Sequence, residues 1–528
     1  MSTKAHIRTA AAALVLLLAA TGCTDGSGGP GKQPTAAPGS TAQGKPADPG
    51  PPALPAALTG QRLDWKACGA PVGAPPAQQH PPARLADGTR WECATLKAPL
   101  DYAKPAGATM GIALIRAKAE YGKSTGSLLF NFGGPGGSGV RGLPNSARLF
   151  GKLRERYDLV SFDPRGVAGS SRVRCLPDKR LDAFFAMDST PDTAAEEKTY
   201  FTASRDFNRA CGKESARVLP HVATTSAARD MDLMREVLGD KKLNYFGFSY
   251  GSKLGGVYAH LFPGNVGRMA IDAIVDPTAD MKHHALNQAI GFQRALDNYF
   301  TSRGQDPKTA TARLVRLLDR LDSSPLPTGS GRGLTEGQAL TGIVVPLYDK
   351  SGWSTLTQAL EEAESGSGST LLALADSYNG REESGRYGLQ MHAQRAVDCA
   401  DAAQRPTPRQ AKASLAEFTK ASPVFGPFLG WDVAGWCADW PVAGEANDPD
   451  VSAPGAAPIL VVGGKGDPAT PYEGAQRMVD ELGPGVGTLL TYEGEGHGAY
   501  GTGDACVTAA VDAYLLAGTL PPKGKSCG

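Results

Sequence analysis

The sequence predicts an α/β protein in which a mainly parallel, doubly wound sheet carries an inserted helical cap domain. Three observations predict this class. Apolar runs of strand length alternate with segments of helical periodicity. Most of the runs are apolar throughout, as in strands that helices cover on both faces. From residue 278 to residue 454 helical patterns dominate, which indicates an insertion between two strands.

The N-terminal segment, residues 1–23, has the features of an export signal. Lys4 and Arg8 form a short positive region. They precede an apolar stretch that is too short to span a membrane. The stretch ends in Ala20-Thr21-Gly22-Cys23, which resembles a bacterial lipobox. We therefore expect Cys23 to carry lipid, with an ordinary secretory signal as the alternative. Residues 24–57 are rich in Gly, Pro and Ser, which predicts a flexible linker.

Residues 58–277 and 455–528 are expected to form the two parts of the core, on either side of the cap at 278–454. The predicted strands are 110–115, 127–132, 157–162, 243–248, 268–275, 458–462 and 488–492. Helical patterns occupy 226–238, with Ser226 as the predicted N-cap, and 252–261, which ends before Pro263. Within the cap, helical patterns occupy 285–299, 310–321 and 411–420.

Charge and cysteine content limit the partners and the compartment. The formal net charge is +1, so no basic field favours nucleic acid. We expect contact with a membrane only through the N-terminal anchor. Nine cysteines include Cys23, and the other eight suit disulfides formed outside the cytosol. Many pairings are possible, and we expect neighbours in sequence to pair: Cys68–Cys93, Cys175–Cys211, Cys399–Cys437 and Cys506–Cys527. No CxxC pair occurs, and we expect neither a metal nor a cofactor.

One short motif suggests a nucleophile. Gly247-Phe248-Ser249-Tyr250-Gly251 fits G-x-S-x-G, the sharp strand-to-helix turn that exposes a catalytic serine. Ser249 follows an apolar run and precedes a helical pattern, as this turn requires. A second match, around Ser124, lies in a polar turn before a strand and is expected to be a chance match. The alternative for Ser249 is a tight structural turn.

A serine nucleophile needs a base and an acid that orients the base. Of eight histidines, His497 lies directly after the last apolar strand, where doubly wound sheets place their sites. Asp467 follows the strand at 458–462 and precedes His497 in the chain. The order Ser249, Asp467, His497 is that of an α/β-hydrolase fold. The alternatives are a solvated loop histidine and an Asx-turn or helix cap at Asp467.

A glycine-rich loop follows the strand at 127–132 and could stabilise an oxyanion. It reads Gly133-Gly134-Pro135-Gly136-Gly137-Ser138-Gly139. We expect the backbone N–H of Gly134 to be one donor and that of Tyr250 to be the other. The same loop also fits G-x-G-x-x-G, with Asp163 near the place of a ribose-binding acid. That dinucleotide reading explains neither the serine turn nor the Asp–His pair.

Taken in order, these motifs resemble the secreted tripeptidyl aminopeptidases of actinobacteria, which are relatives of proline iminopeptidase. Asp163-Pro164-Arg165-Gly166 and Asp467-Pro468-Ala469-Thr470-Pro471 are part of the likeness, which runs from about Trp65 to Cys527. Phe132 departs from the wider iminopeptidase group, which often has histidine there. The resemblance implies a helical cap and cleavage of peptides from a free N-terminus.

An exopeptidase that binds a substrate ammonium needs a partly buried carboxylate facing its site. Asp398 and Asp401, on either side of Cys399 in the cap, are the candidates; the alternative is that both are solvated or paired with an arginine such as Arg395. The leading prediction is an exported serine exopeptidase that acts on peptides. A carboxylesterase with the same triad and a peptide-binding lipoprotein remain as alternatives, and the oligomeric state stays open.

Overall fold

A ten-stranded sheet forms the centre of the protein. The computed structural model describes residues 53–72, 80–446 and 450–528, and the predicted anchor with Cys23 lies outside them. The strands lie in the order β1-β2-β3-β5-β4-β6-β7-β10-β11-β12. Pairing is antiparallel from β1 to β5 and parallel from β5 to β12. The α/β class and its mainly parallel sheet are thereby confirmed.

Each of the seven predicted strands is present, and three further strands, the eight-residue β2 and the two-residue β1 and β12, extend the sheet at its edges. The strands are β1 (Lys66–Ala67), β2 (Glu92–Pro99), β3 (Thr109–Ala117), β4 (Ser127–Asn131), β5 (Asp158–Phe162), β6 (Leu243–Phe248), β7 (Val266–Asp272), β10 (Ile459–Gly466), β11 (Gly487–Glu495) and β12 (Ser526–Cys527). A separate two-stranded ribbon joins β8 (Leu326–Pro327) to β9 (Gly333–Leu334).

Helices cover both faces of the sheet. One apolar core includes side chains of α6 (Thr224–Leu238), α7 (Tyr250–Leu261) and α16 (Tyr472–Leu482), with the short α1 (Ala56–Thr59) at its margin. The opposite core includes side chains of α2 (Gly139–Ser146), α3 (Gly151–Arg154) and α17 (Ala505–Ala517). Burial on both sides explains why the strands are apolar throughout rather than alternating.

Helix α6 begins before its predicted N-cap. Thr224 is its first residue and Ala223 is the N-cap, so the prediction of Ser226 as the cap is wrong. The backbone N–H and hydroxyl of Thr224 both donate to the carboxylate of Asp401, at 2.7 and 2.6 Å. A carboxylate from a distant helix thus satisfies a free N–H of the first turn, and a local side-chain cap is unnecessary.

The helical insertion lies between β7 and β10. Its helices are α8 (Met281–Ser302), α9 (Pro307–Ser323), α10 (Glu336–Leu347), α11 (Trp353–Glu364), α12 (Ser369–Asn379), α13 (Gln390–Asp401), α14 (Pro408–Ala421) and α15 (Gly426–Gly435). Side chains of α8, α9, α10, α11 and α12 form an apolar core that is separate from the two cores of the sheet. We call this region the cap.

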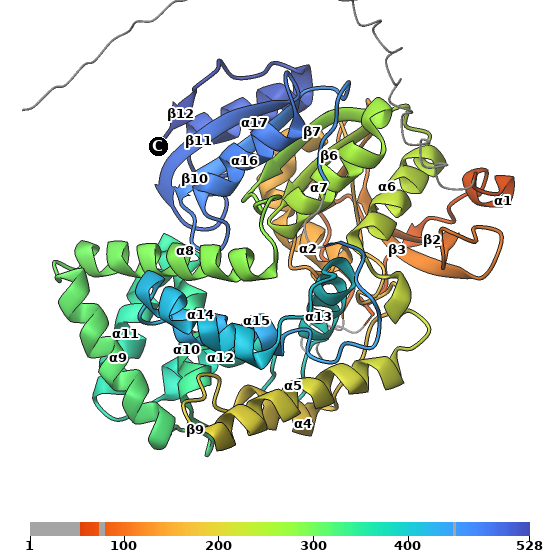
Figure 1. Ribbon diagram of the computed structural model, residues 1–528. Coiled ribbons are helices and arrows are strands. Elements are labelled where there is room, and N and C mark those ends of the chain that lie inside the picture. The colour runs from red at the N-terminus through yellow and green to blue at the C-terminus, as the bar shows by residue number, and fades with distance from the viewer. Residues whose placement is uncertain (1–52, 73–79, 447–449) are drawn as a thin grey trace, which may run out of the picture. The chain divides into compact units, whose positions relative to one another are not determined.

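Two further helices belong to the cap in space, although they precede it in the chain. They are α4 (Asp178–Phe185) and α5 (Ala194–Glu214), between β5 and α6. Figure 1 shows both lying along the cap helices, and the ring of Phe201 packs edge-on against Trp431 of α15, 5.9 Å between centroids. The cap is therefore built from two stretches of sequence.

Four disulfides join the predicted cysteine pairs. They are Cys68–Cys93, Cys175–Cys211, Cys399–Cys437 and Cys506–Cys527. Disulfides of this number indicate a protein that functions outside the reducing cytosol. Among the described residues, no helix is both long and apolar enough to cross a membrane.

Candidate active site

Ser249 occupies the sharp turn between β6 and α7. Its backbone has φ 58° and ψ −122°, a conformation that non-glycine residues rarely adopt and that functional turns retain. The two glycines of the motif are required by space. A Cβ at Gly247 would lie 2.4 Å from the carbonyl oxygen of Gly251, and one at Gly251 would lie 2.6 Å from that of Asn131.

The strained turn is held by hydrogen bonds from both sides. The N–H of Ser249 donates to the carbonyl of Asp272 in β7 (3.0 Å), and the hydroxyl of Ser252 donates to the carbonyl of Ser249 (2.6 Å). Ser124, the second match to the motif, lies in an exposed turn, where its hydroxyl donates to the carbonyl of Gly126 (2.7 Å).

Asp467 and His497 meet at the carboxyl ends of β10 and β11. Nδ1 of His497 lies 2.9 and 3.1 Å from the two oxygens of Asp467. Asp467 is 1% exposed and also accepts the N–H of Thr470 (2.9 Å) and its hydroxyl (3.0 Å). Burial opposes the charged imidazolium of His497, but the charge and hydrogen bond of Asp467 outweigh it and raise the pKa of His497. This is the arrangement of a general base with its orienting acid.

The loop that carries His497 also contacts the cap. The N–H of His497 donates to the carbonyl of Tyr348, 2.7 Å away, just beyond the end of α10. The two rings pack edge-to-face, with 5.3 Å between centroids. The cap thus supplies one of the contacts that fix the imidazole.

The glycine-rich loop lies directly against the serine turn. A Cβ at Gly133 would be 2.8 Å from Cβ of Ser249 and 3.2 Å from the nitrogen of Tyr250. Neither Gly134 N–H nor Tyr250 N–H donates to an acceptor in the described part of the chain. Both N–H groups are therefore without an acceptor among the described residues, and their role as oxyanion donors stays a prediction.

The dinucleotide alternative finds no support at Asp163. Its carboxylate is 2% exposed and accepts the hydroxyl of Ser138 (2.6 Å) and the N–H groups of Val140 (3.1 Å) and Gly169 (2.9 Å). These bonds fix the start of α2 behind the glycine loop. A carboxylate engaged in this way is not free to hold a ribose.

Sequence reasoning missed Asp272, the last residue of β7. It is fully buried, and its carboxylate accepts the N–H groups of Ala499 and Tyr500, which follow His497 in the loop. Burial raises the pKa of Asp272 to about 6. A signal was present, because an aspartate directly after an apolar strand marks the edge where the other candidates lie.

The two cap carboxylates have different environments. Besides Thr224, Asp401 binds Nζ of Lys253 in the first turn after Ser249, at 2.6 Å, so its oxygens are occupied. Asp398 accepts one hydrogen bond among the described residues, from the indole of Trp436 (3.1 Å). Burial raises the pKa of Asp398 to about 7, against the opposing charge of Lys253. Asp398 is therefore the candidate that we retain for binding a cation.

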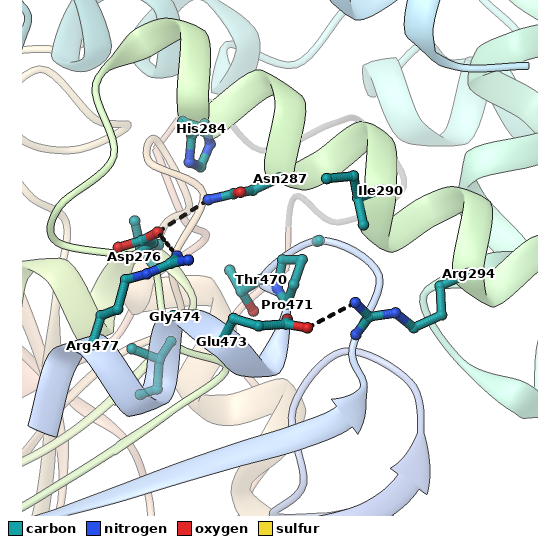
Figure 2. Close-up of a pocket in the computed structure, with 13 residues that line it drawn as sticks. Asp276, His284, Asn287, Ile290, Arg294, Thr470, Pro471, Glu473, Gly474 and Arg477 are labelled. Carbon is teal, nitrogen blue, oxygen red and sulfur yellow. Dashed lines mark hydrogen bonds and ion pairs between the residues drawn. The ribbon is translucent and has the colours of Figure 1, made fainter. Parts of the chain in front are cut away.

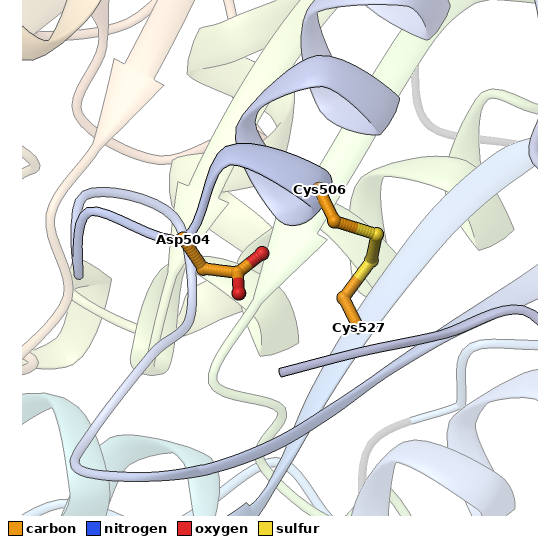
Figure 3. Close-up of side chains that lie close together, drawn as sticks. All are labelled: Asp504, Cys506 and Cys527. Atoms are coloured by element: carbon orange, nitrogen blue, oxygen red, sulfur yellow. A yellow bond between two sulfur atoms is a disulfide. The ribbon is translucent and has the colours of Figure 1, made fainter.

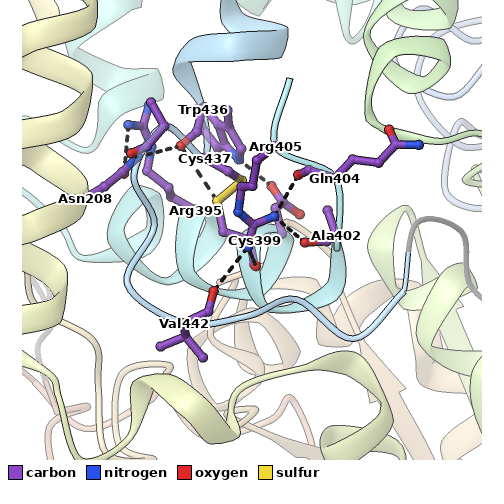
Figure 4. Close-up of a disulfide and its surroundings, with 11 residues drawn as sticks. Asn208, Arg395, Cys399, Ala402, Gln404, Arg405, Trp436, Cys437 and Val442 are labelled. Atoms are coloured by element: carbon purple, nitrogen blue, oxygen red, sulfur yellow. Dashed lines mark hydrogen bonds between the residues drawn. A yellow bond between two sulfur atoms is a disulfide. The ribbon is translucent and has the colours of Figure 1, made fainter. Parts of the chain in front are cut away.

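Helix α13 connects these carboxylates to the glycine loop. A Cβ at Gly136 would lie 2.5 Å from the carbonyl oxygen of Gln390, at the start of α13, and Asp401 ends the helix beside Lys253. Figure 4 shows that the Cys399–Cys437 disulfide ties α13 to the segment that holds Trp436. Arg395 donates to Asn208 (3.3 Å) and stacks on Trp436, 4.3 Å from the ring centroid, and its charge favours the ionised form of Asp398.

A cavity of about 170 Å³ lies between α8 and the start of α16 (Figure 2). Ion pairs join its walls: Asp276 with Arg477, and Arg294 with Glu473. Thr470, which binds Asp467, also lines it. The Arg294–Glu473 pair joins the cap to the core, and both ion pairs occupy the charged groups of the lining, so these groups offer no free charge to a substrate.

In the part of the chain that the structure describes, two groups of side chains have the proximity of metal ligands. Asp504 lies beside Cys506 and Cys527, but Figure 3 shows that these sulfurs form a disulfide, so they are not thiolate ligands. The other group is Asp188, Asp322 and Glu336, near the α4–α5 connection. Neither group adjoins the candidate triad in sequence or shares a hydrogen bond with it.

Comparison with known proteins finds related proteins over most of the chain. A family described as "TAP-like protein" matches residues 422–527. Serine protease Hip1 of Mycobacterium tuberculosis is 36% identical over 492 residues, covering 89% of this chain and 91% of that protein. Carboxylesterase B of Mycobacterium tuberculosis is 33% identical and covers 82% and 86%. Tripeptidyl aminopeptidase of Streptomyces lividans is 29% identical and covers 88% and 86%. With its parallel sheet, serine turn and Asp–His pair, this chain therefore belongs to the α/β-hydrolase family of serine hydrolases that includes Hip1 and the tripeptidyl aminopeptidases of Streptomyces.

Proposed function

We propose that the protein is an exported serine exopeptidase that releases short peptides, of the tripeptide class, from free peptide N-termini. The observation that carries the proposal is the placement of Ser249, Asp467 and His497 directly after the carboxyl ends of β6, β10 and β11, with Nδ1 of His497 2.9 Å from Asp467. Two relatives with peptidase names support the same class.

The reaction proceeds through an acyl-enzyme. The hydroxyl of Ser249 attacks the scissile carbonyl carbon while His497 removes its proton, and Asp467 remains ionised and stabilises the imidazolium. The N–H groups of Gly134 and Tyr250 donate to the developing oxyanion. His497 then protonates the leaving amine, and water hydrolyses the Ser249 ester by the reverse sequence of proton transfers.

The cap supports entry by the amino end. It contacts all three loops of the site: α13 packs on Gly136, Tyr348 on His497, and α8 on Pro468, where a Cβ at Gly291 would lie 2.2 Å from the Pro468 carbonyl oxygen. An enclosed site admits a chain end more readily than the middle of a folded chain. Asp398 offers a half-buried carboxylate for the substrate ammonium, since a desolvated charge needs a partner.

A carboxylesterase with the same triad is the second candidate, because one relative bears that name. Fold and triad serve both reactions, so the choice depends on the substrate. Labelling Ser249 with a fluorophosphonate tests the serine hydrolase in either case. Comparing kcat/KM on tripeptide amides, N-acetylated tripeptide amides and acyl esters separates the two. Equal values on free and acetylated peptides would remove the exopeptidase assignment.

The four disulfides support function outside the cytosol. Within that compartment, we place the protein at the outer face of the cytoplasmic membrane, held by lipid on Cys23. The lipobox-like sequence Ala20-Thr21-Gly22-Cys23 motivates this placement at the membrane. We expect peptides to be the substrates there.

A further inference from the structure

Asp272 connects the loop of the nucleophile to the loop of the base. In the sheet it lies opposite Phe248, next to Ser249, and its backbone carbonyl accepts the N–H of Ser249 at 3.0 Å. Its side chain instead accepts hydrogen bonds from Ala499 and Tyr500, which follow His497 in the chain. One residue therefore bonds the backbone of Ser249 and the backbone of the segment that follows His497.

The carboxylate of Asp272 is satisfied entirely by backbone donors. Oδ2 accepts the N–H groups of Tyr500 at 2.8 Å and Ala499 at 2.9 Å, and Oδ1 accepts the N–H of Ala273 at 2.7 Å. The side chain is fully buried, and no lysine or arginine donates to it in the described part of the chain. Burying a carboxylate without a cationic partner costs free energy, so the fold retains this charge against its own stability.

We propose that Asp272 is a positioning residue for catalysis, which fixes the His497 loop relative to Ser249 and adds a second negative charge near the imidazolium. The proposal rests on the proposed triad. It assigns the residue no contact with substrate. Asp467 orients the ring through Nδ1, whereas Asp272 holds the backbone on which the ring is mounted.

The effect of Asp272 on the charge of His497 depends on all the groups that face the imidazole. These are Asp467 from the loop after β10, Asp272 from β7, and Tyr348 from the cap, whose phenol stays neutral because burial raises its pKa well above the usual value. Both carboxylates raise the pKa of His497. An imidazolium forms when Ser249 loses its proton, so a negative charge nearby favours that step.

The test is Asp272→Asn in the otherwise intact protein. Asparagine keeps the volume, but it removes the charge and turns an NH₂ donor toward the N–H of Ala499 or Tyr500. We expect kcat and the rate of fluorophosphonate labelling of Ser249 to fall ~10–100-fold, with KM changed less than about threefold, because the loss is in the transition state. The acid limb of the labelling rate should move to lower pH by roughly half a unit, since one charge that favours the imidazolium is gone.

Asp512→Asn is the matched control. Asp512 accepts the hydroxyl of Tyr500 (2.9 Å), so it touches the same loop without approaching the triad. We expect its rate and acid limb to match the wild type. If Asp272→Asn retains the wild-type rate and acid limb while thermal melting shows it folded, the proposal is overturned. Wild-type protein that fails to label would instead refute the triad.

Two further measurements test the proposal if Asp272→Asn does not fold. Asp272→Ser, with a smaller side chain that accepts an N–H but carries no charge, is measured in the same way and must show the same losses. Hydrogen exchange in the wild type needs no substitution. Slow exchange of the Ala499 and Tyr500 amides supports the bonds to Asp272, and exchange as fast as in an exposed loop would contradict them.

Discussion

Lys253 and Asp401 form an ion pair in the first turn after Ser249, with 2.6 Å between Nζ and Oδ2 and less than a fifth of either side chain exposed. The pair joins the core helix α7 to the cap helix α13 and leaves Asp398, one turn earlier in α13, with a neutral indole as its hydrogen-bond partner. Asp398 therefore keeps carboxylate oxygens without an ion-pair partner among the described residues, which suits a substrate that arrives as an ammonium.

Ser249→Ala should reduce kcat by at least ~10³ because the acyl-enzyme can no longer form. Binding of a peptide product should be nearly unchanged, since alanine removes only the hydroxyl. Steady-state kinetics and calorimetric titration measure the two effects. Ser124→Ala, the second match to the motif, should retain full activity. Near-normal turnover by Ser249→Ala would end the proposed mechanism.

Asp398→Asn should lower kcat/KM on tripeptide amides with a free N-terminus by ~10–100-fold, the value of one desolvated charge pair. Activity on acyl esters should change little.

Folding raises the pKa of Asp398, so the ionisation of this carboxyl opposes folding. The stability that protonated Asp398 contributes at low pH is lost as the pH rises through about 7. The variant should thus melt no lower than the wild type at pH 8.

Asp401→Asn is the contrasting change. It leaves the half-buried Lys253 without its partner and removes a charged acceptor from the start of α6, so stability should fall by roughly 3 kcal/mol. Thermal or denaturant unfolding measures the loss. If instead Asp401→Asn discriminated against free N-termini and Asp398→Asn did not, the assignment of the two carboxylates would be reversed.

The pH dependence should differ between substrate classes. His497 must be neutral to act as a base, and its raised pKa places the acid limb at higher pH than a free imidazole would, for every substrate. Free peptides also need ionised Asp398, with a pKa of about 7, so their acid limb should be steeper. Their rate should also fall as the substrate amine loses its proton near pH ~8. Profiles of kcat/KM for a free peptide, its acetylated form and an ester measure this, and identical profiles would refute it.

Removing the Cys399–Cys437 disulfide, as Cys399→Ala with Cys437→Ala, should cost about 2–4 kcal/mol and raise KM for free peptides, because it ties Asp398 to Trp436. Removing Cys506–Cys527, at the far edge of the sheet, is the control (Figures 3 and 4). It should cost similar stability and leave KM unchanged. An equal change of KM in both variants would show that the first disulfide has no special link to the site.

Cys23 should incorporate a fatty-acid probe in the native host, whereas Cys23→Ala should not. Fractionation should then move the variant from the membrane to the medium or the soluble fraction. Equal labelling of both proteins would show that the lipobox interpretation is wrong and that the N-terminus is an ordinary secretory signal.

Much of the fold could be predicted from the sequence because its signals are local. Continuous apolar runs mark strands covered on both faces, and the G-x-S-x-G turn needs its glycines for reasons visible within five residues. The pairing of sequence neighbours by disulfides also followed from position along the chain.

Features that depend on distant contacts could not be predicted in this way. The start of α6 is set by Asp401, 177 residues away from Thr224 in the chain, and not by the local Ser226. Helices α4 and α5 join the cap through packing such as that of Phe201 on Trp431, which no local pattern reveals. Asp272 and the difference between Asp398 and Asp401 became visible only when their hydrogen-bond donors were known.

The bond from the N–H of His497 to the carbonyl of Tyr348 has a consequence for selectivity against folded proteins. Its acceptor belongs to the cap and its donor to the catalytic loop, so any motion that separates the two at this point breaks it. A molecule that opens wide to approach a folded neighbour thereby loosens its own base, and it regains full reactivity only when the cap returns. Damage to surrounding proteins is limited by the same contact that prepares the enzyme for a chain end small enough to be enclosed.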